Sequence, residues 1–168
     1  RIVKSAMSEA LGDAHNNTTE GHIQLFERWS KGGAALLITG NTPIDRWHLE
    51  HAGNFALDGQ TDLELISKLA TAAKSGGALV LVQLAHAGRQ TPEAINPSPL
   101  SISDCRLDLP GYGPPKTATE DDLQSVIKQF AASALIAKEA GFDGVEIHSA
   151  HGYLLSSALS SRINTRND

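Results

Sequence analysis

The sequence of 168 residues is long enough for one domain with a buried core, and short for two. It carries 14 Lys+Arg against 19 Asp+Glu, a net charge of -5, and has no basic cluster, so we expect no nucleic-acid partner. No apolar run approaches the roughly 18 residues of a membrane span, so we expect a soluble protein with no membrane partner. The single cysteine, Cys105, excludes an internal disulfide framework and favours a reducing, cytoplasmic location.

Buried apolar strands alternate with amphipathic helices along the whole chain. The predicted strands are residues 1–4, 34–38, 78–84 and 144–148. The first predicted helix begins at Thr18 or Thr19 and ends at Lys31, and the second begins with a capping box of Thr61 and Glu64. The third begins at Thr119 and stops at Gly141, and a fourth begins at about Tyr153.

This alternation predicts an α/β fold in which parallel strands are covered by helices. Two architectures fit, an open doubly wound sheet and a (β/α)8 TIM barrel, and a whole barrel needs about 250 residues. Only the first four βα units of a barrel fit in this length. No Gly-x-Gly-x-x-Gly follows the first strand, so the dinucleotide-binding version of the open sheet loses its main support. Both architectures place function at the C-terminal ends of the strands.

The longest connection, residues 91–118, is rich in proline and glycine. A loop of this length in a compact domain is a lid or binding loop, or else it is disordered. Both interpretations stay open from the sequence.

Two imidazoles and a phenol follow the fourth strand. His148 is expected to be its last residue, and His151 and Tyr153 lie on the turn into the next helix. As a cluster they could hold a substrate oxygen and deliver a proton, although each could singly be structural. The helical zinc motif needs a glutamate beside the first histidine, which is missing here, so we expect no metal site.

Two other strand ends carry polar or small residues. Gln83, an amide on an apolar strand, could pair with a heterocycle or with neighbouring backbone. After it, His86 and Arg89 are candidate loop anchors. The second strand ends in the small residues Thr39-Gly40-Asn41, which would let a ligand approach the backbone.

Several motifs together resemble the old yellow enzyme family of FMN-dependent ene-reductases. The resemblance covers essentially the entire chain. The matching segments are Arg1-Ile2-Val3 with Met7, Gln83-Leu84-Ala85-His86-Ala87-Gly88-Arg89, Ala140-Gly141-Phe142-Asp143-Gly144-Val145-Glu146-Ile147-His148, His151-Gly152-Tyr153 and Asn164-Thr165-Arg166-Asn167-Asp168.

The resemblance implies a (β/α)8 barrel that holds FMN, which NAD(P)H reduces and which passes hydride to the activated C=C of an enone or enal. It implies that Gln83 bonds the flavin edge and that Asn41 lies near a flavin carbonyl. Ala6, Met7 and Ser8 would line the flavin. His148 and His151 would hold the substrate carbonyl, and Tyr153 would donate the proton.

Four residues depart from the family pattern. Ser8 stands where one branch has a cysteine that tunes the flavin, Ala10 where that branch has a tyrosine, and Gly40-Asn41 replaces an acidic-then-small pair. These departures affect redox tuning, substrate choice and the local flavin contact.

We expect residues 1–168 to be the N-terminal half of such a barrel and part of a longer chain. Alone they would bind FMN weakly or not at all, because phosphate-binding loops normally follow strands seven and eight. Open sheet edges leave two further interpretations: homo-oligomer formation, and a non-catalytic half-barrel that acts through protein association. A metal-assisted hydrolase using His148 and His151 is the third hypothesis.

Overall fold

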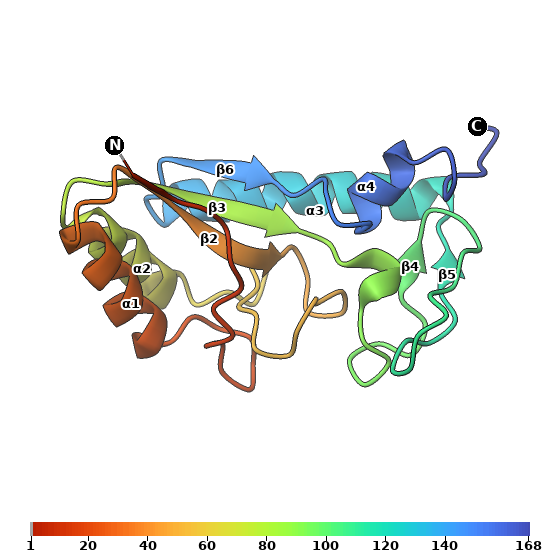
Figure 1. Cartoon of the computed structure of the whole chain (residues 1–168), viewed down its shortest axis with the longest axis horizontal. Coiled ribbons are helices and arrows are strands. Elements are labelled where there is room, and N and C mark those ends of the chain that lie inside the picture. The colour runs from red at the N-terminus through yellow and green to blue at the C-terminus, as the bar shows by residue number, and fades with distance from the viewer. Residues whose placement is uncertain (1) are drawn as a thin grey trace.

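The computed structural model describes residues 2–168, so the predicted start of the first strand at Arg1 lies outside the described residues. Its main sheet has four parallel strands in the order β1-β2-β3-β6 (Figure 1). These strands are β1 (Val3–Lys4), β2 (Leu36–Pro43), β3 (Leu79–Ala85) and β6 (Gly144–Ile147). The predicted α/β fold with parallel strands is confirmed.

Helices connect the strands and cover one face of the sheet. They are α1 (Glu20–Lys31), α2 (Leu63–Lys74) and α3 (Glu120–Glu139), whereas the short α4 (Leu154–Leu159) follows β6 and packs against β4. Alternation along β3 separates the two faces: Val80 and Val82 are fully buried in the core beneath the helices, whereas Leu79 is 58% exposed. Because β1 and β6 are both edges, the main sheet is open within the described residues.

Local capping residues begin α1, α2 and α3, although the cap of α2 differs from the predicted one. Thr19 and Thr119 cap α1 and α3, each with a capping box. The predicted capping box of Thr61 and Glu64 is wrong, because Asp62 is the N-cap of α2 and accepts a hydrogen bond from the Leu65 amide at 3.0 Å. The Thr61 hydroxyl donates instead to the Ala56 carbonyl at 3.2 Å.

Strand boundaries also differ from the prediction, and β3 lies one residue later at both ends. β2 begins two residues later and continues to Pro43, because its chain pairs with β3 again beyond a register shift between Ile38 and Asn41. β6 ends at Ile147 rather than His148. The His148 amide nevertheless donates to the Leu84 carbonyl at 2.9 Å, so His148 stays tied to the end of β3.

The proline-rich connection is folded, so the expectation that it could be disordered is wrong. It follows the 3-10 turn η1 (Gly88–Gln90) and contains a second small sheet of β4 (Leu100–Ser101) and β5 (Lys116–Thr117). Arg89 donates to the Cys105 carbonyl at 3.0 Å, which confirms Arg89 as a loop anchor.

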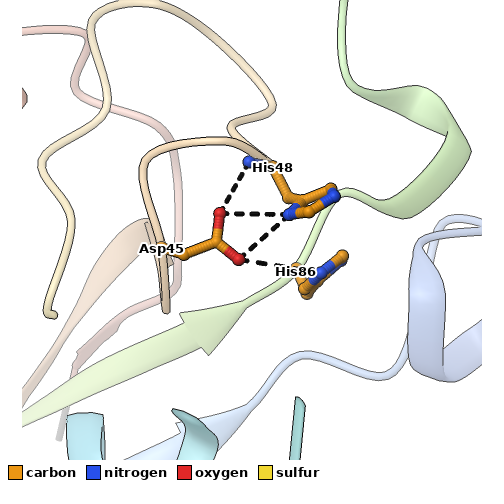
Figure 2. Close-up of side chains that lie close together, drawn as sticks. All are labelled: Asp45, His48 and His86. Atoms are coloured by element: carbon orange, nitrogen blue, oxygen red, sulfur yellow. Dashed lines mark hydrogen bonds and ion pairs between the residues drawn. The ribbon is translucent and has the colours of Figure 1, made fainter. Parts of the chain in front are cut away.

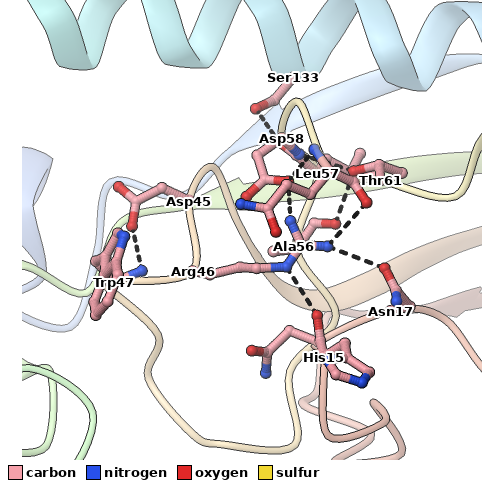
Figure 3. A network of polar contacts seen from close by, with 12 residues as sticks. His15, Asn17, Asp45, Arg46, Trp47, Ala56, Leu57, Asp58, Thr61 and Ser133 are labelled. Atoms are coloured by element: carbon pink, nitrogen blue, oxygen red, sulfur yellow. Dashed lines mark hydrogen bonds and ion pairs between the residues drawn. The ribbon is translucent and has the colours of Figure 1, made fainter.

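A polar network braces the loops that follow β1 and β2 (Figure 3). The Arg46 guanidinium donates to the His15 carbonyl at 2.8 Å and to Asn17 Oδ1 at 3.0 Å, and it forms an ion pair with Asp58. Ser133 of α3 donates to the Leu57 carbonyl at 2.5 Å. The connections that follow β1 and β2 are therefore held against each other, and α3 is tied to the second of them.

Among residues 2–168, no helix has the length and apolar character needed to cross a membrane.

Candidate active site

The segment that follows β1 crosses directly over β2. A Cβ built on Gly40 would lie 2.3 Å from the Met7 carbonyl oxygen and 2.6 Å from Ser8 Cα. Only glycine permits this approach. The small residues at the end of β2 therefore make room for the Met7–Ser8 backbone. Glu9 also holds the two segments together, because both of its carboxylate oxygens accept from the Gly40 amide, at 3.0 and 3.2 Å.

This crossing forms one wall of a cavity of about 180 Å³ at the C-terminal ends of the strands. Every site residue predicted from the sequence lines it, together with Glu50, which sequence reasoning missed. The lining residues are Ala6, Met7, Ser8, Asn41, Glu50, Gln83, His148, His151 and Tyr153.

The two histidines and the tyrosine meet at one end of the cavity. The ring centroids of His148 and Tyr153 are 4.9 Å apart, those of His148 and His151 5.1 Å, and those of His151 and Tyr153 6.1 Å. His148 Nδ1 accepts from the Ala150 amide at 3.3 Å, so the neutral ring carries its proton on Nε2. His148 can thus donate a hydrogen bond to an oxygen in the cavity.

The turn that presents His151 has an unusual backbone. His151 has a φ of 57° and Gly152 a φ of 77°, both in the left-handed region. The Gln90 side chain donates to the His151 carbonyl at 2.7 Å. Gln90 therefore connects the end of β3 to the turn that carries His151.

Burial controls the protonation of this cluster. Burial, and then the neighbouring His151, lower the pKa of His148, which favours the neutral imidazole. Burial, and then the Glu50 carboxylate, raise the pKa of Tyr153 to about 12, with a smaller opposing effect of the Asn41 side chain. At neutral pH the phenol keeps its proton and can act as an acid.

The Gln83 side chain bonds another side chain and not the neighbouring backbone. Its Nε2 donates to Glu146 Oε1 at 2.6 Å, across the β3–β6 pair in which the two residues are in register. The backbone-bonding interpretation is therefore wrong for this side chain. Glu146 therefore orients the amide of Gln83, which lines the cavity.

Glu50 lies in the connection between β2 and α2. Its Oε2 accepts from Ser8 Oγ at 2.7 Å and from Asn41 Nδ2 at 2.9 Å. No local pattern marks this glutamate, because its role depends on two segments distant in the sequence. The only sequence signal for Glu50 was that a carboxylate stands in a long strand-to-helix connection.

Asp45, His48 and His86 form a second polar cluster (Figure 2). Their ligand atoms lie close enough to suggest a metal, but the hydrogen bonds do not fit one. His48 Nε2 accepts from the Leu100 amide and His86 Nδ1 from the Gly88 amide, so each neutral ring carries its proton on the nitrogen that faces Asp45. The cluster joins the ends of β2 and β3 to β4, which confirms His86 as an anchor.

The residues that line the cavity fit the ring system of FMN. The Asn41 and Gln83 amides offer both donors and acceptors, as the edge of a flavin ring requires. The Met7 side chain, 58% exposed, offers an apolar surface on which a planar ring could pack. No lysine or arginine is among the cavity residues within the described part of the chain, so these residues fit the ring and not the phosphate.

Comparisons with known proteins decide the family. The model of the NADH:flavin oxidoreductase / NADH oxidase family matches residues 1–168. The chain belongs to this family. The resemblance to old yellow enzymes is confirmed, and the family match supports FMN and NAD(P)H as the cofactors.

Two fungal relatives of this chain are more than twice as long as the part that it matches. The chain is 37% identical to the NADH-dependent flavin oxidoreductase nadA of Aspergillus parasiticus, and the match covers 100% of the chain and 41% of nadA. It is 34% identical to the NADH-dependent flavin oxidoreductase iliE of Hypocrea jecorina, with 100% of the chain and 47% of iliE covered. The chain thus spans less than half the length of these curated relatives.

The solved structure of TcOYE with pHBA superimposes with a TM-score of 0.91 at 25% identity, and the match covers 100% of this chain and 52% of that one. The predicted partial TIM barrel is therefore consistent with its structural neighbours.

Proposed function

We propose that this chain forms the acceptor side of the active site of an FMN-dependent NAD(P)H oxidoreductase that reduces the C=C of α,β-unsaturated carbonyl compounds. The observation that carries the proposal is the convergence of His148, His151 and Tyr153 on the cavity lined by Ser8, Asn41 and Gln83. Hydrogen-bond donors and a proton donor then face the same volume as the groups that suit a flavin ring.

Each side chain has a distinct part in this proposal. Ala6, Met7 and Ser8 support the flavin ring, while Asn41 and Gln83 bond its edge. Bound FMN supplies the hydride. His148 donates through Nε2–H to the substrate carbonyl oxygen, His151 provides the second donor, and their hydrogen bonds draw electron density away from the alkene.

Tyr153 completes the reduction by giving its phenolic proton to the α-carbon. Tyr153 is 9% exposed, and its raised pKa keeps the phenol protonated until the proton is transferred to the substrate. Burial of His148 and Tyr153 also limits the access of water to this end of the cavity.

The decisive variant is Tyr153→Phe, made in the chain extended through its native downstream sequence. Phenylalanine keeps the ring and removes the proton, so we expect FMN content and NAD(P)H-driven flavin reduction to be retained. The turnover of 2-cyclohexenone should fall by about 100-fold, the lower end of the range for general acid catalysis. Undiminished turnover would remove Tyr153 from the acid role.

Two other functions were considered from the sequence. Among the described residues, His148 and His151 belong to no group of three or more potential metal ligands, which does not favour the hydrolase hypothesis. The association hypothesis needs a chain that acts without any further barrel strands. It predicts that the extended protein has no advantage over residues 1–168 in binding flavin.

A further inference from the structure

Lys4 and Glu9 form a buried ion pair behind the wall of the cavity. Lys4 Nζ lies 3.1 Å from Glu9 Oε1, and the two side chains are only 10% and 4% exposed. Neither residue lines the cavity, and the proposed chemistry uses neither. Burying two charges costs free energy, which their attraction offsets only when the geometry is good and further hydrogen bonds complete the site. Stability alone is therefore a weak reason to bury such a pair.

The further hydrogen bonds of the pair go to β2. Lys4 Nζ also donates to the Ile38 carbonyl at 2.8 Å, and both oxygens of Glu9 accept from the Gly40 amide. β1 ends at Lys4, which is in register with Leu37, so the part of β2 that follows has no β1 residue paired with it. The two side chains take the place of the strand there.

The part of β2 that the pair holds contains the register shift. Pairing with β3 is interrupted and resumes with Asn41, rather than Gly40, opposite Gln83. An extra residue in one strand reverses the face to which the following side chains point. Asn41 and Gln83 both line the cavity beyond this shift. The ion pair therefore holds β2 at the place that directs Asn41 toward the cavity.

The same pair fixes the segment that leaves β1. Lys4 precedes and Glu9 follows residues 6–8, which line the cavity on this side. Both ends of the lining segment are thus bonded to β2. Lys4 Nζ also lies 4.5 Å from the centroid of the Trp29 ring and 5.0 Å from that of Phe26, which connects the pair to α1. These contacts join neighbouring elements within the described part of the chain.

We propose that Lys4 and Glu9 are positioning residues for the flavin: their ion pair fixes residues 6–8 and Asn41 in the arrangement in which they meet the flavin ring. This inference rests on the proposed function in one respect, the place of the flavin ring in the cavity. Burial lowers the pKa of Lys4, and the Glu9 carboxylate opposes that effect and so helps to keep the ammonium charged. Loss of either charge would leave the other buried without its partner.

The test removes the ion pair in the extended protein and measures the flavin site. Lys4→Met removes the positive charge and keeps an unbranched side chain, so the Glu9 carboxylate loses its cation. Lys4→Met/Glu9→Gln removes both charges and keeps an acceptor for the Gly40 amide. Lys68→Met is the matched control, because it breaks an exposed ion pair with Glu64 on α2.

Three measurements are made on each protein. Flavin fluorescence titration gives the FMN affinity, and the visible absorption spectrum reports the surroundings of the bound ring. Thermal unfolding without FMN reports stability. We expect Lys4→Met to weaken FMN binding about tenfold and to shift the spectrum of the flavin that remains bound, because the lining segment loses its fixed position. Lys4→Met/Glu9→Gln should regain most of the affinity and the wild-type spectrum, and Lys68→Met should match the wild-type protein.

Wild-type affinity and spectrum in Lys4→Met would overturn the proposal. A weaker affinity that only follows a loss of thermal stability, with an unchanged spectrum, would also overturn it, because the pair would then be merely structural. The same holds if Lys4→Met/Glu9→Gln binds FMN as weakly as Lys4→Met.

A further variant keeps the test decisive if Lys4→Met does not fold. Lys4→Met/Glu9→Leu has no unpaired charge and no acceptor for the Gly40 amide. Its FMN affinity should be about tenfold below that of Lys4→Met/Glu9→Gln, since one hydrogen bond is lost, and equal affinities would overturn the proposal. Turnover of Tyr153→Phe tests the acid role and does not involve the ion pair. Failure of the proposed reaction is therefore distinguishable from failure of this inference, which is measured by FMN affinity and spectrum.

Discussion

At the scale of single residues, the site depends on side chains that hold others in position. Gln90 donates to the carbonyl of His151, whose left-handed backbone is not favoured for a residue other than glycine. The Cβ that a larger residue would add at Gly152 would lie 2.9 Å from Gln90 Nε2. Glycine at position 152 therefore leaves the room that the Gln90 amide needs to reach the His151 carbonyl.

Gln90→Glu tests this positioning role. The variant keeps the shape of the side chain but replaces the donor with a carboxylate that faces the His151 carbonyl. We expect the KM for the enone to rise about fivefold with a smaller change in kcat, since one exposed hydrogen bond is lost and the acid Tyr153 is untouched. Gln24→Glu on the exposed face of α1 is the control. Equal kinetics in both variants would contradict the role.

At the scale of elements, the crossing of the β1 connection over β2 builds the wall of the cavity. Gly40 provides the space, and the register shift in β2 lies at the same place. From the sequence we expected a ligand to approach the backbone at these small residues. The Met7–Ser8 backbone occupies it instead, and this contact presents Ser8 to Glu50.

Gly40→Ala should therefore damage both stability and flavin binding. The added methyl group would force the Met7 carbonyl to move, which we expect to lower the free energy of unfolding by about 1–3 kcal/mol. Because Met7 and Ser8 move with it, the affinity for FMN should fall as well. Gly59→Ala is the matched control, since nothing lies within 4 Å of the Cβ it would add.

Urea unfolding and flavin fluorescence titration measure the two effects. If Gly40→Ala and Gly59→Ala behaved alike, the close crossing would not be a feature of the folded protein.

At the scale of the whole molecule, two buried histidines couple stability to pH. Burial lowers the pKa of His22 to about 4, and burial followed by His48 lowers the pKa of His86 to about 3. Both values lie below the ordinary value of 6.5, so between pH 6.5 and about 4 the unfolded chain binds more protons than the folded one. Stability is complete above pH 6.5 and falls as the pH drops through this window.

The expected slope approaches about 1.4 kcal/mol per pH unit for each histidine. Urea unfolding of the extended protein at pH 7 and pH 5 measures it. His22→Gln keeps an acceptor for the capping box of α1 and removes the titrating group. Its pH dependence should be shallower than that of the wild-type protein, and an unchanged slope would show that His22 does not contribute.

The open edges of the sheet lead to a second prediction at this scale. Four strands present a cavity that suits the flavin ring, without a lysine or arginine among its described lining residues to hold a phosphate. We expect FMN to bind tightly to the extended chain and weakly to residues 1–168. A flavin fluorescence titration of both proteins checks this. Tight binding by the short chain would show that residues 1–168 complete a flavin site without downstream sequence, through association with a second copy.

The sequence by itself determined the strands, the helices and the residues that follow each strand, because hydrophobic periodicity and capping are local. It therefore predicted the parallel fold and the cluster of His148, His151 and Tyr153 at the end of the fourth strand, whereas Gln83 was placed in the same site only by the family resemblance. Only the tertiary structure decided that Glu50 lies beside Ser8 and Asn41, that Gln90 holds His151, and that the Gln83 amide bonds Glu146. These contacts join loops distant along the chain, and their geometry depends on how the connections fold over the strand ends.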